Sequence, residues 1–354
     1  MLASIRTCRG AASALVIGLA IAATEPSGAV AESWSTASSV TLKADVERLA
    51  EGARGRFGKA EAEAIKAFYE NREYQPLWYE GGTLSPRARH LFAALRDVDK
   101  QGLDSRQYGL PGLEAKASAA SGAAQSKMEL QLTRTLIDYA GDLAGGSVLP
   151  SRAAPGVFRR PERPDPQRIL SEAADAPNFD RFLAGLAPKS RRYVQLQRAL
   201  IRYRALAAKG GWQKVSAGPT LKPGMKDPRI VQVRNRLRVT GDLTKTSADP
   251  TEFDDILKEA VARFQDRHGL TEDGAVGRNT IAAMNIPVDQ RIRQIEINME
   301  RRRWMPNALG SYYIWVNLAD FYLKVVQNTE TIYTARLVVG KTYTRTPIFS
   351  SEVK

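Results

Sequence analysis

The chain has 354 residues, which is too many for one ordinary domain, so two or three domains are expected. Hydrophobic residues make up 43% of it, which excludes wholesale disorder, and the net charge of +14 favours a polyanionic partner. The only cysteine is Cys8, so the chain can form no internal disulfide and no cluster of thiolate ligands.

The first residues have the pattern of a secretory signal peptide, predicted at residues 1–31. Two arginines precede a short apolar run at residues 11–23, and Ala29, Val30 and Ala31 supply the small residues that precede a cleavage site. The apolar run is too short to span a bilayer. We therefore expect export to the periplasm or cell envelope, with no stable membrane anchor after cleavage.

Helical periodicity dominates the next part of the chain. Apolar residues such as Leu42, Val46 and Leu49 recur at the spacing of one helix face. The segment at residues 145–166 is rich in Gly, Pro and Arg and is expected to be an irregular loop. A further helix is predicted over residues 191–208, before two consecutive glycines.

A second helical unit is predicted over residues 218–287. A glycine ends its first helix, Thr251 and Asp254 resemble a capping box at the start of its second, and a third short helix follows. The buried stripe of this unit is expected to comprise Ile230, Val233, Leu237, Leu257, Val261 and Phe264.

The pattern changes after a polar helix predicted at residues 291–303. Residues 312–318, 321–326 and 332–339 are rich in β-branched and aromatic residues, which predicts antiparallel strands joined by short turns. Three such strands leave an unpaired edge and a half-covered apolar face. We expect them to be the first strands of an incomplete, mostly-β domain.

Residues 260–280 read AVARFQDRHGLTEDGAVGRNT. This segment resembles the peptidoglycan-binding repeat of wall hydrolases and transpeptidases. The matching positions are Phe264-Gln265, His268-Gly269-Leu270, Asp273-Gly274, Val276-Gly277 and Thr280.

Four other segments resemble the large L,D-transpeptidase family, in that family's order. FYENREYQPLWYE (68–80) and QGLDSRQYGL (101–110) resemble its scaffold domain. IRQIEINMERRRWMP (292–306) resembles the approach to its catalytic domain, and VVGKTYTRTPIFSS (338–351) resembles that domain's first strands. The resemblance implies a mainly α multidomain protein.

With the signal peptide set apart, the resemblance predicts four segments of the mature chain. A helical scaffold domain is expected at residues 32–215 and a peptidoglycan-binding domain at residues 216–287. A connecting helix is expected at residues 288–310. The incomplete first part of the catalytic domain is expected at residues 311–354.

The family reaction is acyl transfer in cell-wall cross-linking. A cysteine thiolate, activated by a histidine, takes the acyl group from a tetrapeptide stem and passes it to an amine. The family's H-G-T and S-x-G-C-x-R elements do not occur in these 354 residues, so no catalytic residue is assigned, and no cofactor or metal is expected. These residues alone are expected to bind the wall without turnover. The alternative is a non-catalytic, secreted peptidoglycan-binding or scaffold protein.

Polar side chains on the second helical unit are the candidate contacts to peptidoglycan. Arg234, Arg263, Arg267 and Asn279 are expected to be exposed, and stem peptides carry carboxylates and amides that such groups bind. Peptidoglycan is therefore the expected partner. Nucleic acid is not, since aromatic and basic residues are not interleaved. The oligomeric state is left open.

Two other groups of residues have competing interpretations. Tyr69, Tyr74, Trp78 and Tyr79 could stack on sugars, but packing in a helical core is preferred. His268 lies in the turn of the repeat, where fixing the helix end by a hydrogen bond is preferred over binding a metal.

Overall fold

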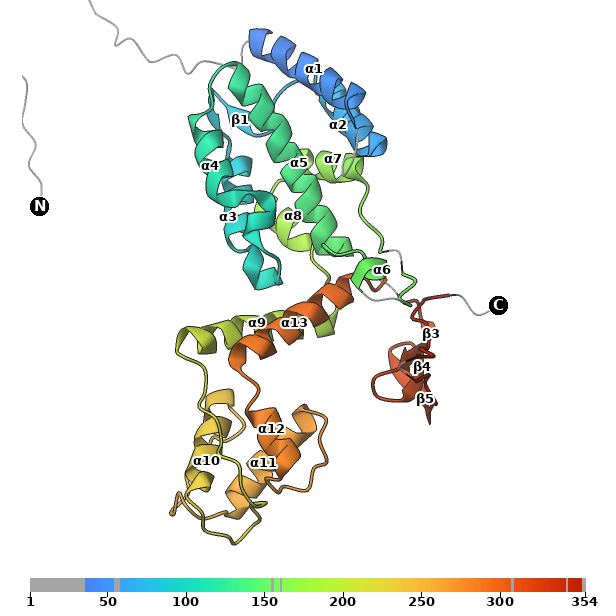
Figure 1. Cartoon of the computed structure of the whole chain (residues 1–354). Coiled ribbons are helices and arrows are strands. Elements are labelled where there is room, and N and C mark those ends of the chain that lie inside the picture. Colours follow the sequence, from blue (N-terminus) through green and yellow to red (C-terminus); the bar gives the residue numbers. More distant parts are fainter. Residues whose placement is uncertain are drawn as a thin grey trace, which may run out of the picture.

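The computed structural model describes residues 36–53, 58–153, 156–159, 161–306, 309–341 and 343–351. The chain is mainly α-helical with a small antiparallel sheet near its C-terminal end (Figure 1), which confirms the predicted fold class. The predicted signal peptide lies outside the described residues. None of the helices in the described ranges combines the length and the apolar character needed to cross a membrane.

The first part of the chain is a helical bundle built around one long helix, α5 (Ala123–Gly145). The other elements of the bundle are α1 (Thr36–Glu51), α2 (Lys59–Asn71), β1 (Tyr79–Glu80), β2 (Thr83–Leu84), α3 (Pro86–Arg96), η1 (Val98–Gln101), η2 (Ser105–Tyr108), α4 (Leu110–Ala119), α6 (Pro150–Ala153), α7 (Pro166–Asp175) and α8 (Phe179–Gly185). Helices α1, α4 and α7 pack on α5, and α2 packs on α1 and α7. The short helix α6 lies inside the segment predicted to be an irregular loop, so that prediction is wrong at this point.

Side-chain caps fix where several of these helices begin. The side chain of Ser85 accepts a hydrogen bond from the N–H of Ala88, and Asp165 accepts one from the N–H of Arg168. A proline follows each cap in the first helical position, where its missing N–H costs no hydrogen bond. The starts of α3 and α7 are therefore encoded locally.

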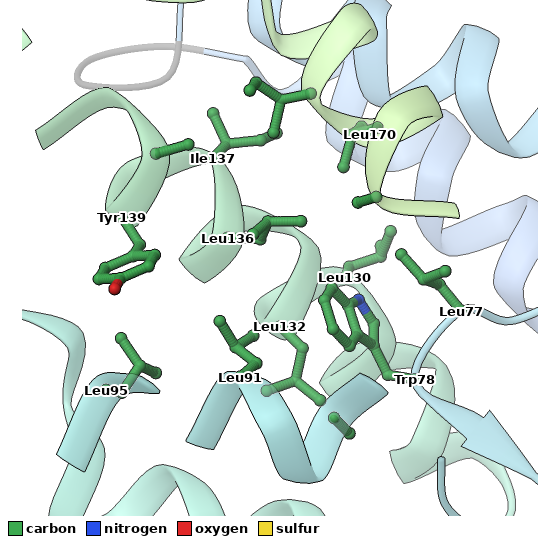
Figure 2. Close-up of a cluster of buried hydrophobic side chains, with 14 of the residues drawn as sticks. Leu77, Trp78, Leu91, Leu95, Leu130, Leu132, Leu136, Ile137, Tyr139 and Leu170 are labelled. Atoms are coloured by element: carbon green, nitrogen blue, oxygen red, sulfur yellow. The ribbon is translucent and has the colours of Figure 1, made fainter. Parts of the chain in front are cut away.

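The bundle core lies where α3 and α7 face α5. In Figure 2, Leu91 and Leu95 of α3 face Leu132 and Tyr139 of α5, with Trp78 beside them. All five side chains are buried. Each large apolar side chain buried in this way contributes about 1.5–3 kcal/mol. This core is the main source of the bundle's stability.

The aromatic residues that could have stacked on sugars belong mostly to this core. Tyr69, Trp78 and Tyr79 are buried, and Tyr74 is partly exposed at the edge of the same cluster. The Tyr79 hydroxyl donates to the carbonyl of Ala117 at 2.8 Å, so its polar end is satisfied inside the protein. Core packing, the preferred interpretation, is confirmed for the three buried residues.

A buried carboxylate, Glu129 of α5, holds the segment before β1. It accepts hydrogen bonds from the N–H of Leu77 at 2.5 Å, the N–H of Trp78 at 3.1 Å and the Tyr69 hydroxyl at 2.8 Å. The Thr133 hydroxyl lies 2.6 Å from that of Tyr69 and 2.9 Å from the indole Nε1 of Trp78. Burial raises the pKa of Glu129 to about 7. Periodicity alone did not single out this residue.

Two helices lie side by side below the bundle, α9 (Arg191–Ala208) and α13 (Val288–Arg303) (Figure 1). Both were predicted from the sequence, although α13 begins three residues earlier than expected. Their shared apolar contact is formed by Tyr193, Leu200 and Met299, all buried. The pair is thus held by a small core of its own, separate from that of the bundle.

The C-terminal end of α13 returns to the bundle. The buried guanidinium of Arg303 donates to the Tyr193 hydroxyl at 2.9 Å and to the carbonyl of Gln101, and it pairs with Glu300 at 2.9 Å. Glu300 also accepts from the N–H of Val148 at 2.8 Å. Side chains of one helix turn therefore join α9, α13 and two segments of the bundle.

The three predicted strands form one antiparallel sheet in chain order: β3 (Tyr312–Asn317), β4 (Tyr322–Gln327) and β5 (Glu330–Arg336). The predicted third strand, at residues 332–339, starts and ends too late. The reason is the two-residue turn of Asn328 and Thr329, whose φ values of 47° and 76° fit a tight hairpin and let β5 start at once.

Candidate functional site

A second compact unit, called the module below, comprises residues 215–287 and has its own hydrophobic core. Its helices are α10 (Arg229–Thr240), α11 (Asp255–Arg267) and α12 (Arg278–Met284). Asp254 caps α11 by accepting a hydrogen bond from the N–H of Leu257 at 2.8 Å, so the helix begins three residues later than a capping box with Thr251 in the cap position predicts. All six members of the predicted stripe are fully buried: Ile230, Val233, Leu237, Leu257, Val261 and Phe264.

One buried amide, Gln265 of α11, organises the loop between α11 and α12. Its Nε2 donates to the Asp273 carboxylate at 2.8 Å and to the carbonyl of Ala275 at 2.9 Å, and it lies 3.2 Å from the Thr280 hydroxyl. Its Oε1 accepts from the N–H of Gly274 at 2.9 Å. The Gln265 side chain thus contacts three residues of the loop between α11 and α12 and one residue of α12.

The structure contradicts the expected exposure of Arg234. Its side chain is 0% exposed, pairs with Asp254 at 2.9 Å and donates to the carbonyl of Glu252 at 2.6 Å. Position 234 lies four residues after Ile230 and three before Leu237, so it shares their helix face and is carried into the interior. Arg234 therefore supports the start of α11 rather than offering a free surface group.

Arg263 and Arg267, by contrast, reach the surface and meet at Asp242. The Nε and Nη2 of Arg263 donate to the carbonyl of Asp242 at 3.3 and 3.1 Å, and its side chain is 54% exposed. Arg267 binds the Asp242 carboxylate in a bidentate manner at 3.1 and 2.6 Å. This pairing raises the pKa of Arg267, although burial works in the opposite direction. Of the two, Arg263 has the larger exposed fraction.

Asn279 is exposed, but on another side of the module. It lies in the first turn of α12 beside Thr280, whose hydroxyl contacts Gln265. Along α11, Gln265 is about 200° around the helix axis from Arg263. The structure therefore brings Arg263 and Arg267 together, places Asn279 apart from them and buries Arg234. The four predicted contacts do not form one site.

A stacked pair at the base of the module was not predicted. The guanidinium of Arg236 lies over the Trp212 ring, 3.8 Å from its centroid, and its Nε donates to the carbonyl of Met284 at 2.8 Å. Burial lowers the pKa of Arg236 to about 10. The glycine pair followed by a tryptophan marked the end of α9 in the sequence, but nothing there indicated which arginine the ring meets.

The segment that enters the module and the segment that leaves it are hydrogen-bonded to each other. Asn285 accepts from the N–H of Val215 and donates to its carbonyl, both at 2.8 Å. Gly211 has a φ of 70°, and a Cβ there would lie 2.8 Å from the Val288 side chain, so glycine is required. The module is thus an insertion between α9 and α13, held at both ends.

His268 fixes the end of α11, as predicted. Its Nδ1 lies 2.7 Å from the carbonyl of Phe264, and its ring stacks on the Phe264 ring with centroids 3.9 Å apart. Burial is the main cause that lowers the pKa of His268, to about 4. The imidazole is therefore neutral in the folded module at neutral pH.

This shift predicts that the module loses stability in acid. The unfolded chain binds a proton at His268 near pH 6.5 and the folded module only near pH 4, so stability falls as the pH drops through that window. The free energy of unfolding falls by at most roughly 3 kcal/mol, because the ring is partly exposed and solvent weakens the effect. His268→Asn keeps a donor for the Phe264 carbonyl and removes the titration. Urea unfolding from pH 7 to 4 should show a smaller loss for His268→Asn than for the wild type, and parallel curves would contradict the assignment.

The described residues contain no group of three or more His, Cys, Asp or Glu side chains placed to hold a metal ion. The other histidine, His90, pairs with Asp180 at 2.7 Å on the surface of the bundle. Neither histidine therefore lies in a cluster of potential ligands in this part of the chain.

Comparison with known families places two matches on these two units. Residues 63–200 match the model of the scaffold domain, which covers most of the bundle and reaches into α9. Residues 226–284 match the model titled "Putative peptidoglycan binding domain" and coincide with the three helices of the module. A comparison with curated proteins found no match. The two matches in this order fit an L,D-transpeptidase-like architecture, and the second supports binding to the cell wall.

Proposed function

We propose that the protein binds peptidoglycan through the module and acts in cell-wall cross-linking in the periplasm or cell envelope, after export by a cleaved signal peptide at residues 1–31. The match of residues 226–284 to a peptidoglycan-binding model is the observation that carries the binding. The intact core of the module and the hydrogen bonds of Gln265 support it, because the matched repeat is folded around them.

The cross-linking role rests on the order of the segments. We propose a scaffold domain at residues 32–215, a peptidoglycan-binding domain at 216–287, a connecting helix at 288–310 and the first part of a catalytic domain at 311–354. The separate cores of bundle and module support this division. The reaction would be acyl transfer from a tetrapeptide stem through a cysteine. The residues given hold only Cys8, within the predicted signal peptide, so their own proposed activity is binding.

Arg263 is the best candidate for a contact to the wall. It is exposed, its guanidinium keeps donors beyond those used by the carbonyl of Asp242, and stem peptides carry the carboxylates that such donors bind. Arg267 and Asn279 remain proposed contacts of the same kind. Arg234 is proposed only as a buried support.

Purified sacculi are expected to pull down the full chain at moderate salt, while immobilised DNA is not. Arg263→Ala should weaken the binding about three- to tenfold, the usual effect of losing one charge-assisted hydrogen bond. Arg181→Ala, which removes an exposed arginine from α8 of the bundle, is the matched control and should leave binding unchanged. Equal retention on DNA and sacculi would reject peptidoglycan as the partner.

These 354 residues contain no cysteine outside the predicted signal peptide, which favours a second function, that of a non-catalytic wall-binding protein. The same purified chain, incubated with tetrapeptide stems, separates the two. Release of D-alanine or formation of cross-linked stems would support an enzyme. Sacculus binding without turnover would support the binding protein for this stretch of chain.

A further inference from the structure

An open groove runs between α9 and α13. It has a volume of about 460 Å³ and is lined by Arg192, Gln195, Leu196, Asn298 and Arg302. The first three are spaced by three and four residues on α9, and the last two by four residues on α13, so each set lies on one helix face. The helix pair thus presents two arginines and two amides to one groove.

One aromatic ring lies against both arginines. The guanidinium of Arg192 is 5.4 Å from the centroid of the Trp315 ring, and that of Arg302 is 5.3 Å from it. Trp315 belongs to β3, so the sheet supplies a ring that contacts both arginines of the groove. Within the described part of the chain, no carboxylate lies within ion-pair distance of either guanidinium. Two positive charges therefore face each other without a negative partner.

Helix stability does not explain the position of Arg192. It lies in the first turn of α9, which has no acidic residue, and a cation there opposes the positive end of the helix dipole. Arg302 lies in the last turn of α13, where a cation is favourable. Yet burial and the charge of Arg192 both lower the pKa of Arg302. Locally unfavourable charges of this kind are expected at functional sites.

We propose that this groove binds a carboxylate of a peptidoglycan stem peptide. The proposal rests on the function proposed above and adds a second contact to the wall, distinct from the module. Guanidinium groups bind carboxylates through paired N–H donors, and the Gln195 and Asn298 amides match the peptide groups of a stem. A bound carboxylate would also relieve the repulsion between the two arginines.

Titration of a soluble tetrapeptide stem into the full chain tests the groove directly. Isothermal titration should give saturable binding that is lost when the peptide's carboxylates are converted to amides. Arg192→Ala and Arg302→Ala should each weaken the affinity roughly tenfold. The affinity of Arg302→Lys should lie between those of the wild type and Arg302→Ala, since lysine keeps the charge without the paired donors. Arg198→Ala is the matched control. It removes an exposed arginine of the same helix, about 240° around the axis from Arg192, and should have no effect.

Sacculus pulldown separates this proposal from the one before it. If Arg263→Ala weakens sacculus binding while Arg192→Ala and Arg302→Ala weaken stem binding, both stand. If Arg263→Ala leaves sacculus binding unchanged while Arg192→Ala and Arg302→Ala weaken stem binding, the groove stands and the module's role fails. Equal affinity for the carboxylate and amide peptides, or an equal loss in Arg198→Ala, would overturn the groove. So would binding to vesicles of anionic phospholipid with the same dependence on both arginines and no binding of stems. Circular dichroism of each variant checks that its helices are intact.

Discussion

Replacement of Glu129 by alanine is expected to destabilise the helical bundle by about 3–5 kcal/mol at neutral pH. The change leaves a cavity at a fully buried position and removes the acceptor of two backbone N–H groups, those of Leu77 and Trp78. It also removes one partner of the Tyr69 hydroxyl, which keeps Thr133. The effect is large because donors without partners are costly in a protein interior.

Urea unfolding followed by circular dichroism measures this loss, and hydrogen exchange at the amides of Leu77 and Trp78 locates it. Glu114→Ala is the control. It removes an exposed glutamate of α4 that pairs with Arg96 at 2.7 Å and should cost less than about 1 kcal/mol. An unchanged exchange rate at Leu77 in Glu129→Ala would show that the carboxylate does not hold this segment.

The raised pKa of Glu129 adds a pH dependence of opposite sign to that of His268. The folded bundle binds a proton at Glu129 near pH 7 and the unfolded chain near pH 4.5, so stability falls as the pH rises through this range. The free energy of unfolding falls by roughly 3 kcal/mol across this range. Glu129→Gln cannot titrate, so its unfolding free energy should vary less between pH 5 and 8. Identical slopes for variant and wild type would contradict the shift.

Replacement of Gln265 by leucine is expected to unfold the loop between α11 and α12 and to abolish sacculus binding. Leucine fits the volume, but it leaves the N–H of Gly274 without its partner and the carbonyl of Ala275 with only the Thr280 hydroxyl, at 3.4 Å. Each buried polar group left unpaired costs about 1–3 kcal/mol, so the free energy of unfolding of the module is expected to fall by about 2–5 kcal/mol. Because a small module is only marginally stable, a loss of this size is expected to unfold the loop.

Two measurements together test the role of Gln265. Hydrogen exchange should rise across residues 271–280 in Gln265→Leu, and the pulldown by sacculi should fail in parallel. Gln294→Leu is the matched control on the exposed side of α13 and should behave like the wild type. Full sacculus binding by a variant whose loop exchanges freely would show that binding does not need the folded repeat.

The helix and strand pattern could be predicted where one face of an element repeats. The buried stripe from Ile230 to Phe264 follows helix spacing, and the cap at Asp254 uses a local hydrogen bond, so neighbouring residues contain the information. Arg234 shows the limit of this reasoning. Its charge indicated exposure, whereas its position on the stripe placed it inside, and the geometry of the helix outweighed the residue type.

Contacts between distant segments could not be predicted. The meeting of Arg263 and Arg267 at Asp242 depends on how the turn after α10 approaches α11. The groove beside Trp315 requires α9 to meet α13 and β3, which lie about a hundred residues further along the chain. Periodicity within one element gives no information on such approaches.

The sequence by itself determined the helical class of the protein, the order of its units, the strands near its end and the resemblance of residues 260–280 to a wall-binding repeat. These features depend on interactions over a few residues, so the local pattern contains them. The tertiary structure was needed to show that the module is inserted between two paired helices, that Glu129 and Arg234 are buried, and that Arg192 and Arg302 lie over one ring. Burial and charge pairing depend on which surfaces the whole chain brings together, and that is settled only when the separate cores have formed.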